Sequence, residues 1–262
     1  MNLYLNDKVI LVSGGAKGIG EAIAKSLASE NAIPVIIGRN QDDNNRVVQE
    51  IIAAGGKCAS VVAELSEPSA CEKAIKETVA LFGRIDGLVN NAGLNDGVGL
   101  ENGNYEDFMK SIHNNLVHYY LLAHHALPYL KQSKGSIVNI SSKTGVTGQG
   151  ETSGYAASNG GRNALTREWA VELLKYDIRV NAVIVAECWT PQYERWIQTL
   201  PNAEETLNEI NARIPLQNRM TKASEIADTV AFLLSEKSSH TTGQMLYVDG
   251  GYVHLDRSLL RQ

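Results

Sequence analysis

The chain has 262 residues, of which 44% are hydrophobic and 20% are charged, and its formal net charge is −5. This length suits one large domain, and the acidic balance leaves no basic excess for binding nucleic acid or an anionic membrane. No apolar run reaches the roughly 18 residues of a transmembrane helix, and the amino end lacks the positive and apolar regions of a signal peptide. Three cysteines without CxxC spacing argue against a disulfide framework and a zinc site, so we expect a cytoplasmic protein.

Short β-branched runs alternate with longer helical patterns along the chain. The predicted strands cover residues 8–14, 34–39, 58–65, 85–93, 135–142, 179–186 and 244–251. The predicted helices between them cover residues 18–31, 44–54, 69–82, 105–131 and 154–175. Strands that are apolar throughout are buried on both faces, and helical crossovers join parallel neighbours. The pattern therefore predicts an α/β fold over residues 1–262, with one domain built on an open, doubly wound sheet of seven parallel strands.

The longest irregular segment, about residues 187–222, follows the carboxyl end of the sixth predicted strand. Open α/β sheets bind their ligands at these ends. The segment is rich in aromatic and charged side chains, among them Trp189, Tyr193, Arg195 and Trp196. We expect it to form a partly helical lid over the substrate.

The first predicted strand runs directly into the glycine-rich sequence SGGAKGIG at residues 13–20, and a helix follows. Gly14, Gly18 and Gly20 let the backbone turn tightly and approach a pyrophosphate, while the helix amino terminus offers unpaired N–H groups. An ordinary strand-to-helix turn is the alternative. The strand before, the helix after and the early position together favour nucleotide binding.

Four further motifs occur in order behind this GxxxGxG turn. They are NNAG at residues 90–93, Asn115 in the next helix, Ser142 at the end of the fifth strand, and Tyr155. The whole chain thereby resembles the short-chain dehydrogenase/reductase family, which implies a Rossmann-type fold and hydride transfer with a nicotinamide dinucleotide. The stretches SSKTGVTGQGETSGYAAS, LTREWA, SSHTTGQ and VDGGYVHLDRSL look like those of bacterial L-fucose dehydrogenases, which oxidise the anomeric carbon of a pyranose to a lactone.

The end of the second predicted strand indicates which dinucleotide is preferred. A carboxylate there would bind the free 2′-hydroxyl of NAD and repel the 2′-phosphate of NADP, but this chain has Gly38 and Arg39. Arg39 can bind a phosphate, and Lys17 can add a second positive charge. A solvated loop arginine is the competing interpretation, and we expect NADP with NAD possible. Together with the resemblance, this gives a cofactor set of Gly14, Lys17, Gly18, Ile19, Gly20, Arg39, Glu64, Leu65, Asn91, Ala92, Gly93, Tyr155, Asn159, Val185 and Thr190.

The predicted cofactor-binding segments depart from the family pattern at three positions. The family usually has Asp where Glu64 stands, and Pro-Gly where Val185 and Ala186 follow the sixth strand. Alanine in place of glycine forbids a positive φ at little cost if φ was negative. Because both replacements keep a backbone donor and acceptor, we expect cofactor binding to survive.

The chemistry of the resembling family needs a base for the hydroxyl proton. Tyrosine, whose side chain in water ionises with a pKa of about 10, is a poor base near neutrality unless positive charge stabilises its phenolate. In the family a lysine four residues after the tyrosine supplies this charge, but here that position holds Asn159. Asn159 could still bond a ribose hydroxyl, yet only the oxidised nicotinamide would remain to assist Tyr155. We expect a rate loss of roughly 10²–10⁴, the usual contribution of a positioned proton-transfer group.

Three explanations of Asn159 remain open: an engineered substitution, a natural non-catalytic relative, and a natural enzyme with a rearranged base. Lys143 is a candidate cation for the third, although neighbouring positions on an extended segment face opposite ways. By resemblance, Asn115 anchors a proton-relay water and Ser142 holds the substrate oxygen. The predicted catalytic set is Asn115, Ser142, Tyr155 and Asn159.

Polar and aromatic residues crowd the predicted crevice and favour a polyhydroxylated sugar. The predicted substrate set is Asn95, Ser142, Lys143, Gln149, Tyr155, Glu187 and Trp196. No metal is expected, because the histidines of helix 105–131 do not bring three side chains onto one face.

The predicted function is an NADP-preferring oxidoreductase acting on a sugar such as L-fucose, with its activity reduced by Asn159. A dinucleotide-binding sensor without turnover is the alternative. Helices 105–131 and 154–175 resemble the family's tetramer interface, and the amphipathic tail HLDRSLLRQ is expected to pack on another subunit, so we expect a homotetramer.

Overall fold

The structure is a computed structural model that describes residues 2–255. Within these residues one sheet has seven parallel strands in the order β3-β2-β1-β4-β5-β6-β7, which confirms the predicted doubly wound α/β sheet. The strands are β1 Val9–Ser13, β2 Ile33–Gly38, β3 Ala59–Val62, β4 Gly87–Asn90, β5 Ser136–Ser142, β6 Arg179–Val185 and β7 Met245–Val248. The predicted tail beyond residue 255 lies outside the described residues.

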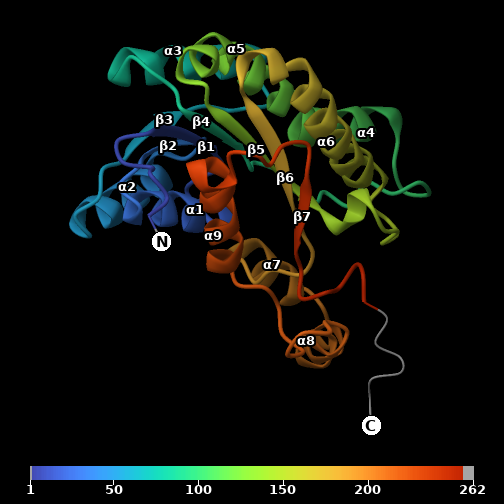
Figure 1. Cartoon of the computed structure of the whole chain (residues 1–262). Helices are drawn as coiled ribbons and strands as arrows, with labels where there is room; N and C mark the ends of the chain where they lie inside the picture. The colour runs from blue at the N-terminus through green and yellow to red at the C-terminus, as the bar shows by residue number, and fades with distance from the viewer. Residues whose placement is uncertain (1, 256–262) are drawn as a thin grey trace.

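Helices cover both faces of the sheet (Figure 1). They are α1 Gly18–Ser29, α2 Gln41–Ala53, α3 Pro68–Phe82, α4 Tyr105–Ile112, α5 His118–Ser133, α6 Ser153–Glu172, α7 Pro191–Ile197, α8 Ala203–Ala212 and α9 Ala223–Leu234. In the figure α3, α5 and α6 lie on one face, and α1, α2 and α9 lie on the other. Among the described residues, no helix is long and apolar enough to cross a membrane.

Alternate residues of the central strands fill separate cores on the two faces, as the period of a strand requires. On β1, Val9 and Leu11 pack with α3 and α5, while Ile10 and Val12 pack with α1 and α9. All four side chains are almost fully buried. This explains why the strands are apolar throughout instead of alternating with polar residues.

The helix predicted over residues 105–131 is not a continuous α-helix. A π-helical turn at His113–Val117 separates α4 from α5. Asn115 lies in this turn, and its side-chain amide donates to the Ser111 carbonyl at 3.0 Å, where it competes with the regular helical bonding. π-Turns of this kind occur frequently at functional sites.

The segment over residues 187–222 is partly helical, as predicted, since it contains α7 and α8. Its two ends lie together: Cys188 and Thr221 form a parallel bridge, and the Thr221 N–H donates to the Glu187 carbonyl at 2.9 Å. The segment therefore leaves and rejoins the domain at one place, beside the carboxyl end of β6.

Candidate active site

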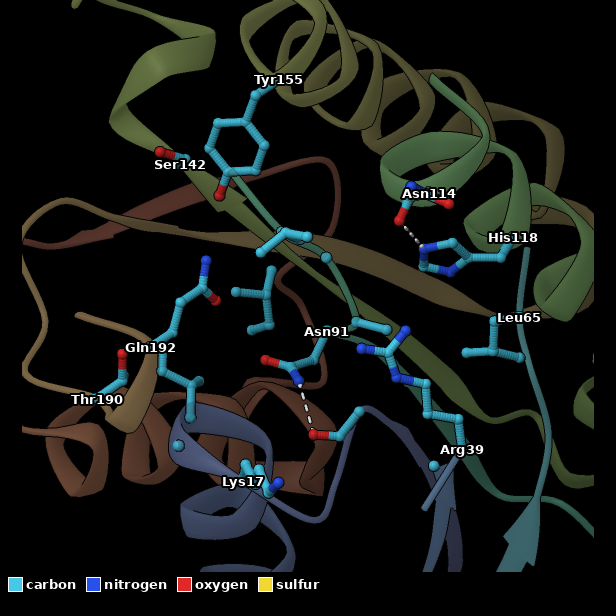
Figure 2. Close-up of a pocket in the computed structure, with 18 of the residues that line it drawn as sticks. Lys17, Arg39, Leu65, Asn91, Asn114, His118, Ser142, Tyr155, Thr190 and Gln192 are labelled. Carbon is cyan, nitrogen blue, oxygen red and sulfur yellow. Dashed lines mark hydrogen bonds between the residues drawn. The ribbon is translucent and has the colours of Figure 1, made fainter. Parts of the chain in front are cut away.

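A cleft of about 630 Å³ lies at the carboxyl ends of the central strands. The sheet register places Ser142 beside Val185, and Val185 beside Val248. Figure 2 shows Ser142 and Tyr155 at one end of the cleft, and Lys17 and Arg39 at the other. A ligand in this cleft would therefore touch the glycine-rich turn and the candidate catalytic pair at the same time.

The glycine-rich turn is shaped by its backbone. Gly14 and Gly18 have φ values of +65° and +55°, in the left-handed region that favours glycine. A Cβ on Gly20 would overlap the Gly14 carbonyl and lie 2.6 Å from Asn91 Nδ2. Asn91 Nδ2 donates to the Ser13 carbonyl at 2.9 Å, so the NNAG segment holds the turn in place. These contacts leave a cradle lined by main-chain groups.

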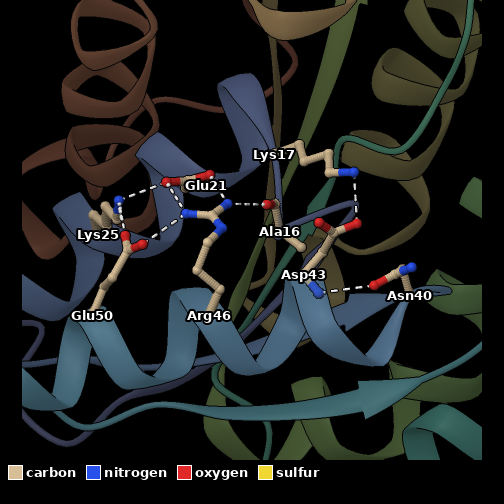
Figure 3. A network of polar contacts seen from close by, with 8 residues as sticks. All are labelled: Ala16, Lys17, Glu21, Lys25, Asn40, Asp43, Arg46 and Glu50. Carbon is tan, nitrogen blue, oxygen red and sulfur yellow. Dashed lines mark hydrogen bonds and ion pairs between the residues drawn. The ribbon is translucent and has the colours of Figure 1, made fainter.

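An ion network fixes the same turn between α1 and α2 (Figure 3). Arg46 donates to the Ala16 carbonyl at 3.0 Å and to Glu21 at 2.7 Å, and Glu50 pairs with both Arg46 and Lys25. Burial raises the pKa of Glu21, but the hydrogen bonds from Arg46 and Lys25 outweigh it and leave that pKa below its usual value. The network therefore carries its full charge near neutral pH and ties the turn to α2.

The two cations expected at a 2′-phosphate are each paired with a carboxylate. Lys17 Nζ lies 2.6 Å from Asp43, and Arg39 Nη1 lies 3.6 Å from Glu64. The Arg39 side chain is 79% exposed, so it can turn toward a ligand at little cost. The sequence did not reveal that a carboxylate neutralises each of these cations. The position of Asp43 explains this for Lys17, because Asp43 lies in α2 and not at the end of β2.

The end of the cleft that we name the catalytic end, after the prediction, contains the candidate catalytic residues Ser142 and Tyr155. The Ser142 hydroxyl accepts a hydrogen bond from the Thr144 N–H at 3.2 Å, and the Tyr155 hydroxyl points into the cleft (Figure 2). Asn115, in the π-turn, is fully buried. Its side-chain oxygen accepts from the Leu94 N–H at 2.7 Å, and its main-chain carbonyl accepts from Arg162 Nε at 2.7 Å.

Asn159 is fully buried and does not line the cleft. Its Nδ2 donates to the Tyr155 carbonyl at 2.9 Å, and its Oδ1 accepts from Arg162 Nη1 at 3.0 Å. The Arg162 guanidinium carbon lies 5.9 Å from the centre of the Tyr155 ring. The expectation that only the nicotinamide could bring positive charge to Tyr155 is therefore wrong, because a fixed cation from the next turns of α6 adjoins it.

Lys143 is also paired. It begins a short 3-10 turn at Lys143–Gly145 and forms an ion pair with Glu187 in which both side chains are nearly buried. The premise that Lys143 continues an extended segment is therefore wrong. The Glu187 carboxylate also accepts from the Tyr193 hydroxyl, whose pKa is raised by burial and by this carboxylate. The Lys143 charge is therefore balanced within the protein by Glu187.

The structure brings most of the predicted cofactor residues together in the cleft, but of the predicted substrate residues only Ser142 and Tyr155 line it. Those that line the cleft are Gly14, Lys17, Gly18, Ile19, Arg39, Glu64, Leu65, Asn91, Ala92, Gly93, Ser142, Tyr155, Val185 and Thr190. Those outside its lining are Gly20, Asn95, Asn115, Lys143, Gln149, Asn159, Glu187 and Trp196. Gly20 and Asn115 lie directly behind lining residues.

Several lining residues were missed by the sequence analysis. They include Lys110, Asn114, His118, Arg162 and Gln192. His118 was interpreted as a core or surface histidine; it is 1% exposed and still borders the cleft. The signal for Arg162 was its place seven residues after Tyr155, which puts both on one helix face.

At the end of β6, Val185 and Ala186 both line the cleft. Ala186 is not among the described residues with a left-handed backbone, so alanine fits this turn without strain. Among residues 2–255, no group of three or more His, Cys, Asp and Glu side chains could hold a metal ion.

Comparison with known proteins gives one family and several close relatives. The family model described as Enoyl-(Acyl carrier protein) reductase matches residues 14–253. The chain is 36% identical to the 3-oxoacyl-(acyl-carrier-protein) reductase of Thermotoga maritima over 96% of this chain and 100% of that protein. It is 32% identical to the L-fucose dehydrogenase of Rattus norvegicus over 93% of this chain and 88% of that protein. The crystal structure of Cj0485 dehydrogenase aligns with a TM-score of 0.93 and 46% identity over 99% of both chains.

Proposed function

Because the chain belongs to the short-chain dehydrogenase/reductase family, we propose that it is an NADP-preferring oxidoreductase that converts the anomeric carbon of a sugar such as L-fucose to a lactone. The observation that carries the proposal is the cleft that joins the glycine-rich turn to Ser142 and Tyr155. The similarity to L-fucose dehydrogenase supports the choice of a sugar.

The described residues fit a dinucleotide. The positive φ of Gly14 and Gly18 opens the cradle, and a Cβ on Gly14 would lie 3.1 Å from Ala92 Cα. The main-chain groups of the turn and the amino end of α1 would hold the pyrophosphate, with Thr190 beside Gly18 on the other side. A dinucleotide held in this way would supply a hydride acceptor at the end of the cleft that Ser142 and Tyr155 line.

The protein's own residues handle the proton and orient the sugar. Ser142 donates a hydrogen bond to the oxygen of the reacting carbon. Tyr155, as the phenolate, takes the hydroxyl proton while that carbon loses its hydride, so the C–O bond becomes the carbonyl of a lactone. Atoms and charge balance in this step, since one proton and one hydride leave the hemiacetal.

The lid offers aromatic surface for a sugar ring. The rings of Trp189, Tyr193 and Trp196 pack on one another, and the two tryptophans are 42% and 45% exposed. Lys143 and Glu187, together with Asn95 and Gln149, are proposed to meet sugar hydroxyls when the lid rearranges around substrate. Aromatic faces and paired polar groups favour a polyhydroxylated substrate over an acyl chain.

The preference for NADP rests on Arg39 and Lys17 and on the absence of a carboxylate in the β2 turn. The reduced activity expected from Asn159 assumed an isolated tyrosine, and the position of Arg162 supports measurable turnover. A cytoplasmic location stays a prediction. So does a homotetramer formed through α4, α5 and α6, which is consistent with exposed apolar side chains at Tyr120 and Val171.

The deciding experiment is steady-state oxidation of L-fucose, D-arabinose and L-galactose with NADP and with NAD, with the lactone identified directly. We expect turnover with at least L-fucose, faster at low cofactor concentration with NADP. Tight NADP binding without oxidation of any of these sugars would contradict the proposal and favour a dinucleotide-binding sensor.

A further inference from the structure

Arg162 places a buried positive charge next to the candidate base. Its side chain is 2% exposed, yet the guanidinium borders the cleft. Its central carbon lies 4.3 Å from the Tyr119 ring centre and 5.9 Å from that of Tyr155. Of these two phenols, Tyr119 is fully buried and donates its hydroxyl to the Ile140 carbonyl at 2.9 Å, so only Tyr155 is free to reach a ligand.

The hydrogen-bond partners of Arg162 are all neutral. Nε donates to the Asn115 carbonyl at 2.7 Å, and Nη1 donates to the Ile140 carbonyl and to Asn159 Oδ1 at 3.2 and 3.0 Å. Nη2 is buried and has no partner among residues 2–255. A Cβ on Gly93 would lie 2.7 Å from Nη2, so the glycine of the NNAG segment leaves room for this atom.

The hydrogen bonds from Nε and Nη1 hold the π-turn, β5 and Asn159 together, but a structural role does not account for the unpaired Nη2. Removing an ion from water costs several kcal/mol unless an opposite charge or enough hydrogen bonds compensate. Arg179 likewise has only neutral partners, but both of its Nη atoms donate: Nη1 to the Leu233 carbonyl and the Ser238 hydroxyl, and Nη2 to the Ser235 carbonyl. Arg162 borders the cleft and leaves Nη2 without an acceptor among the described residues, which points to an acceptor, such as a phenolate, that forms only during function.

Helix geometry explains how Arg162 reaches Tyr155. Seven residues span about two turns, or roughly 10 Å, and return to the same face. Helical side chains lean toward the amino terminus, so a long arginine side chain extends back toward Tyr155. Asn159 lies between them on this face and fixes the guanidinium through Oδ1. A lysine at position 159 would have brought a second cation against Arg162.

We propose that Arg162 supplies the positive charge that stabilises the Tyr155 phenolate, with Asn159 orienting its guanidinium, so that the cation sits seven and not four residues after the base. This inference rests on the proposed function for the role of Tyr155 as base. Arg162 acts through Tyr155 and is a positioning residue.

The other titratable groups around this pair come from α4, α5 and the segment after β5. On α5, burial and the Arg162 charge lower the pKa of His118 to about 3, and burial raises the pKa of Tyr119 above its usual value. Lys110 on α4 borders the cleft, and Lys143 is balanced by Glu187 from the lid. Above pH 5, a change at Arg162 is therefore expected to act mainly on Tyr155.

The test replaces Tyr155 with 3-fluorotyrosine and follows its ionisation by fluorine NMR in the full chain without cofactor or sugar. Arg162→Gln removes the charge and keeps a donor, and Arg162→Lys keeps the charge. We expect the Gln variant to move the ionisation midpoint upward by about one pH unit or more, and the Lys variant to stay close to the original. Arg167→Gln is the matched control, because Arg167 is an exposed arginine on the same helix.

Kinetics on chains with the natural tyrosine give the second readout. Arg162→Gln is expected to lower kcat about 10²-fold with a smaller effect on the KM of the sugar, and to move the rise of kcat to higher pH. Adding Asn159→Lys to Arg162→Gln should restore part of the rate, because it returns a cation to the same helix face.

If Arg162→Gln does not fold, Asn159→Asp tests the same idea, since it sets a carboxylate of equal size against the guanidinium and neutralises its charge. An unchanged ionisation midpoint in these neutralised variants overturns the inference, and so does a rate loss without a midpoint shift. If no sugar is oxidised but the midpoint moves as expected, the proposed function fails and the inference on Arg162 stands.

Discussion

The two ends of the cleft are built in different ways. The phosphate-binding end is made of main-chain groups from consecutive residues, and the shape of Gly14 to Gly20 follows from their φ values and close contacts. The catalytic end is made of side chains from β5, the π-turn and α6. A site made of main-chain groups can be predicted from the spacing of residues in the sequence. A site made of side chains depends on tertiary contacts between residues that are distant in the sequence.

The two ends also differ in how charge is balanced. At the phosphate end Lys17 and Arg39 are paired with Asp43 and Glu64, and the pairs are largely exposed. At the catalytic end Arg162 is buried with neutral partners only. Changes at the catalytic end should therefore have larger effects than changes of the same charge at the phosphate end.

The largest effect is expected from Tyr155→Phe, which removes the base and keeps the ring. It should lower kcat by about 10²–10⁴, as measured by steady-state kinetics. Tyr119→Phe is the matched control, because the Tyr119 ring also faces Arg162 but its hydroxyl is used by the Ile140 carbonyl. Equal losses in the two variants would show that the comparison of the two phenols is wrong.

The next largest effect concerns acid stability. The pKa of His118 is lowered to about 3 by burial and by Arg162, so the folded protein keeps this histidine neutral while the unfolded chain protonates near 6.5. The contribution of His118 to the free energy of unfolding is therefore fully present above pH 6.5. It decreases as the pH drops below this value, by about 2–3 kcal/mol at pH 4.5. Urea unfolding at several pH values measures this, and His118→Gln should make the free energy of unfolding depend less on pH. An unchanged pH dependence would mean that other titratable groups determine the acid stability.

A smaller effect is expected from Gly20→Ala at the phosphate end. The added Cβ meets the Gly14 carbonyl and Asn91, and neither can move freely, so the variant should lose about 1–3 kcal/mol of unfolding free energy and bind NADP more weakly. Gly148→Ala is the control, since a Cβ there has nothing within 4 Å and φ is not positive. Denaturant midpoints compare the two. Similar stability in both would mean that the turn is less tightly packed than the contacts indicate.

The smallest effect is expected from Arg39→Ala, because its side chain is exposed and solvent screens its charge. It should weaken NADP binding by about 1.5 kcal/mol, near tenfold in Kd, and leave NAD binding unchanged. Glu64→Gln should act in the opposite direction by releasing Arg39. Calorimetric titration of both variants with NADP and with NAD measures these changes. Tighter binding of NAD than of NADP by the unmodified chain would overturn the NADP assignment.

The sequence predicted the α/β fold and the seven strands because the period of apolar residues and the glycine stops are local properties. It also predicted the glycine-rich turn, the NNAG segment, Ser142 and Tyr155, since each ends a strand or begins a helix at the same edge of the sheet. It missed the π-turn at His113–Val117, because that turn depends on side-chain and main-chain bonds to Ser111 and Arg162.

The sequence by itself determined the seven strands and the glycine-rich turn of this protein, the place of its cleft and the identity of the phenol that faces it. Only the tertiary structure decided how the charges are arranged there. Lys143 turns to Glu187, and Asn159 turns away from the cleft to Arg162, which reaches back along α6 to Tyr155. Long side chains can span two helix turns, and their direction is set by which oxygens from other elements accept their hydrogens, so sequence spacing alone does not fix where their charge lies.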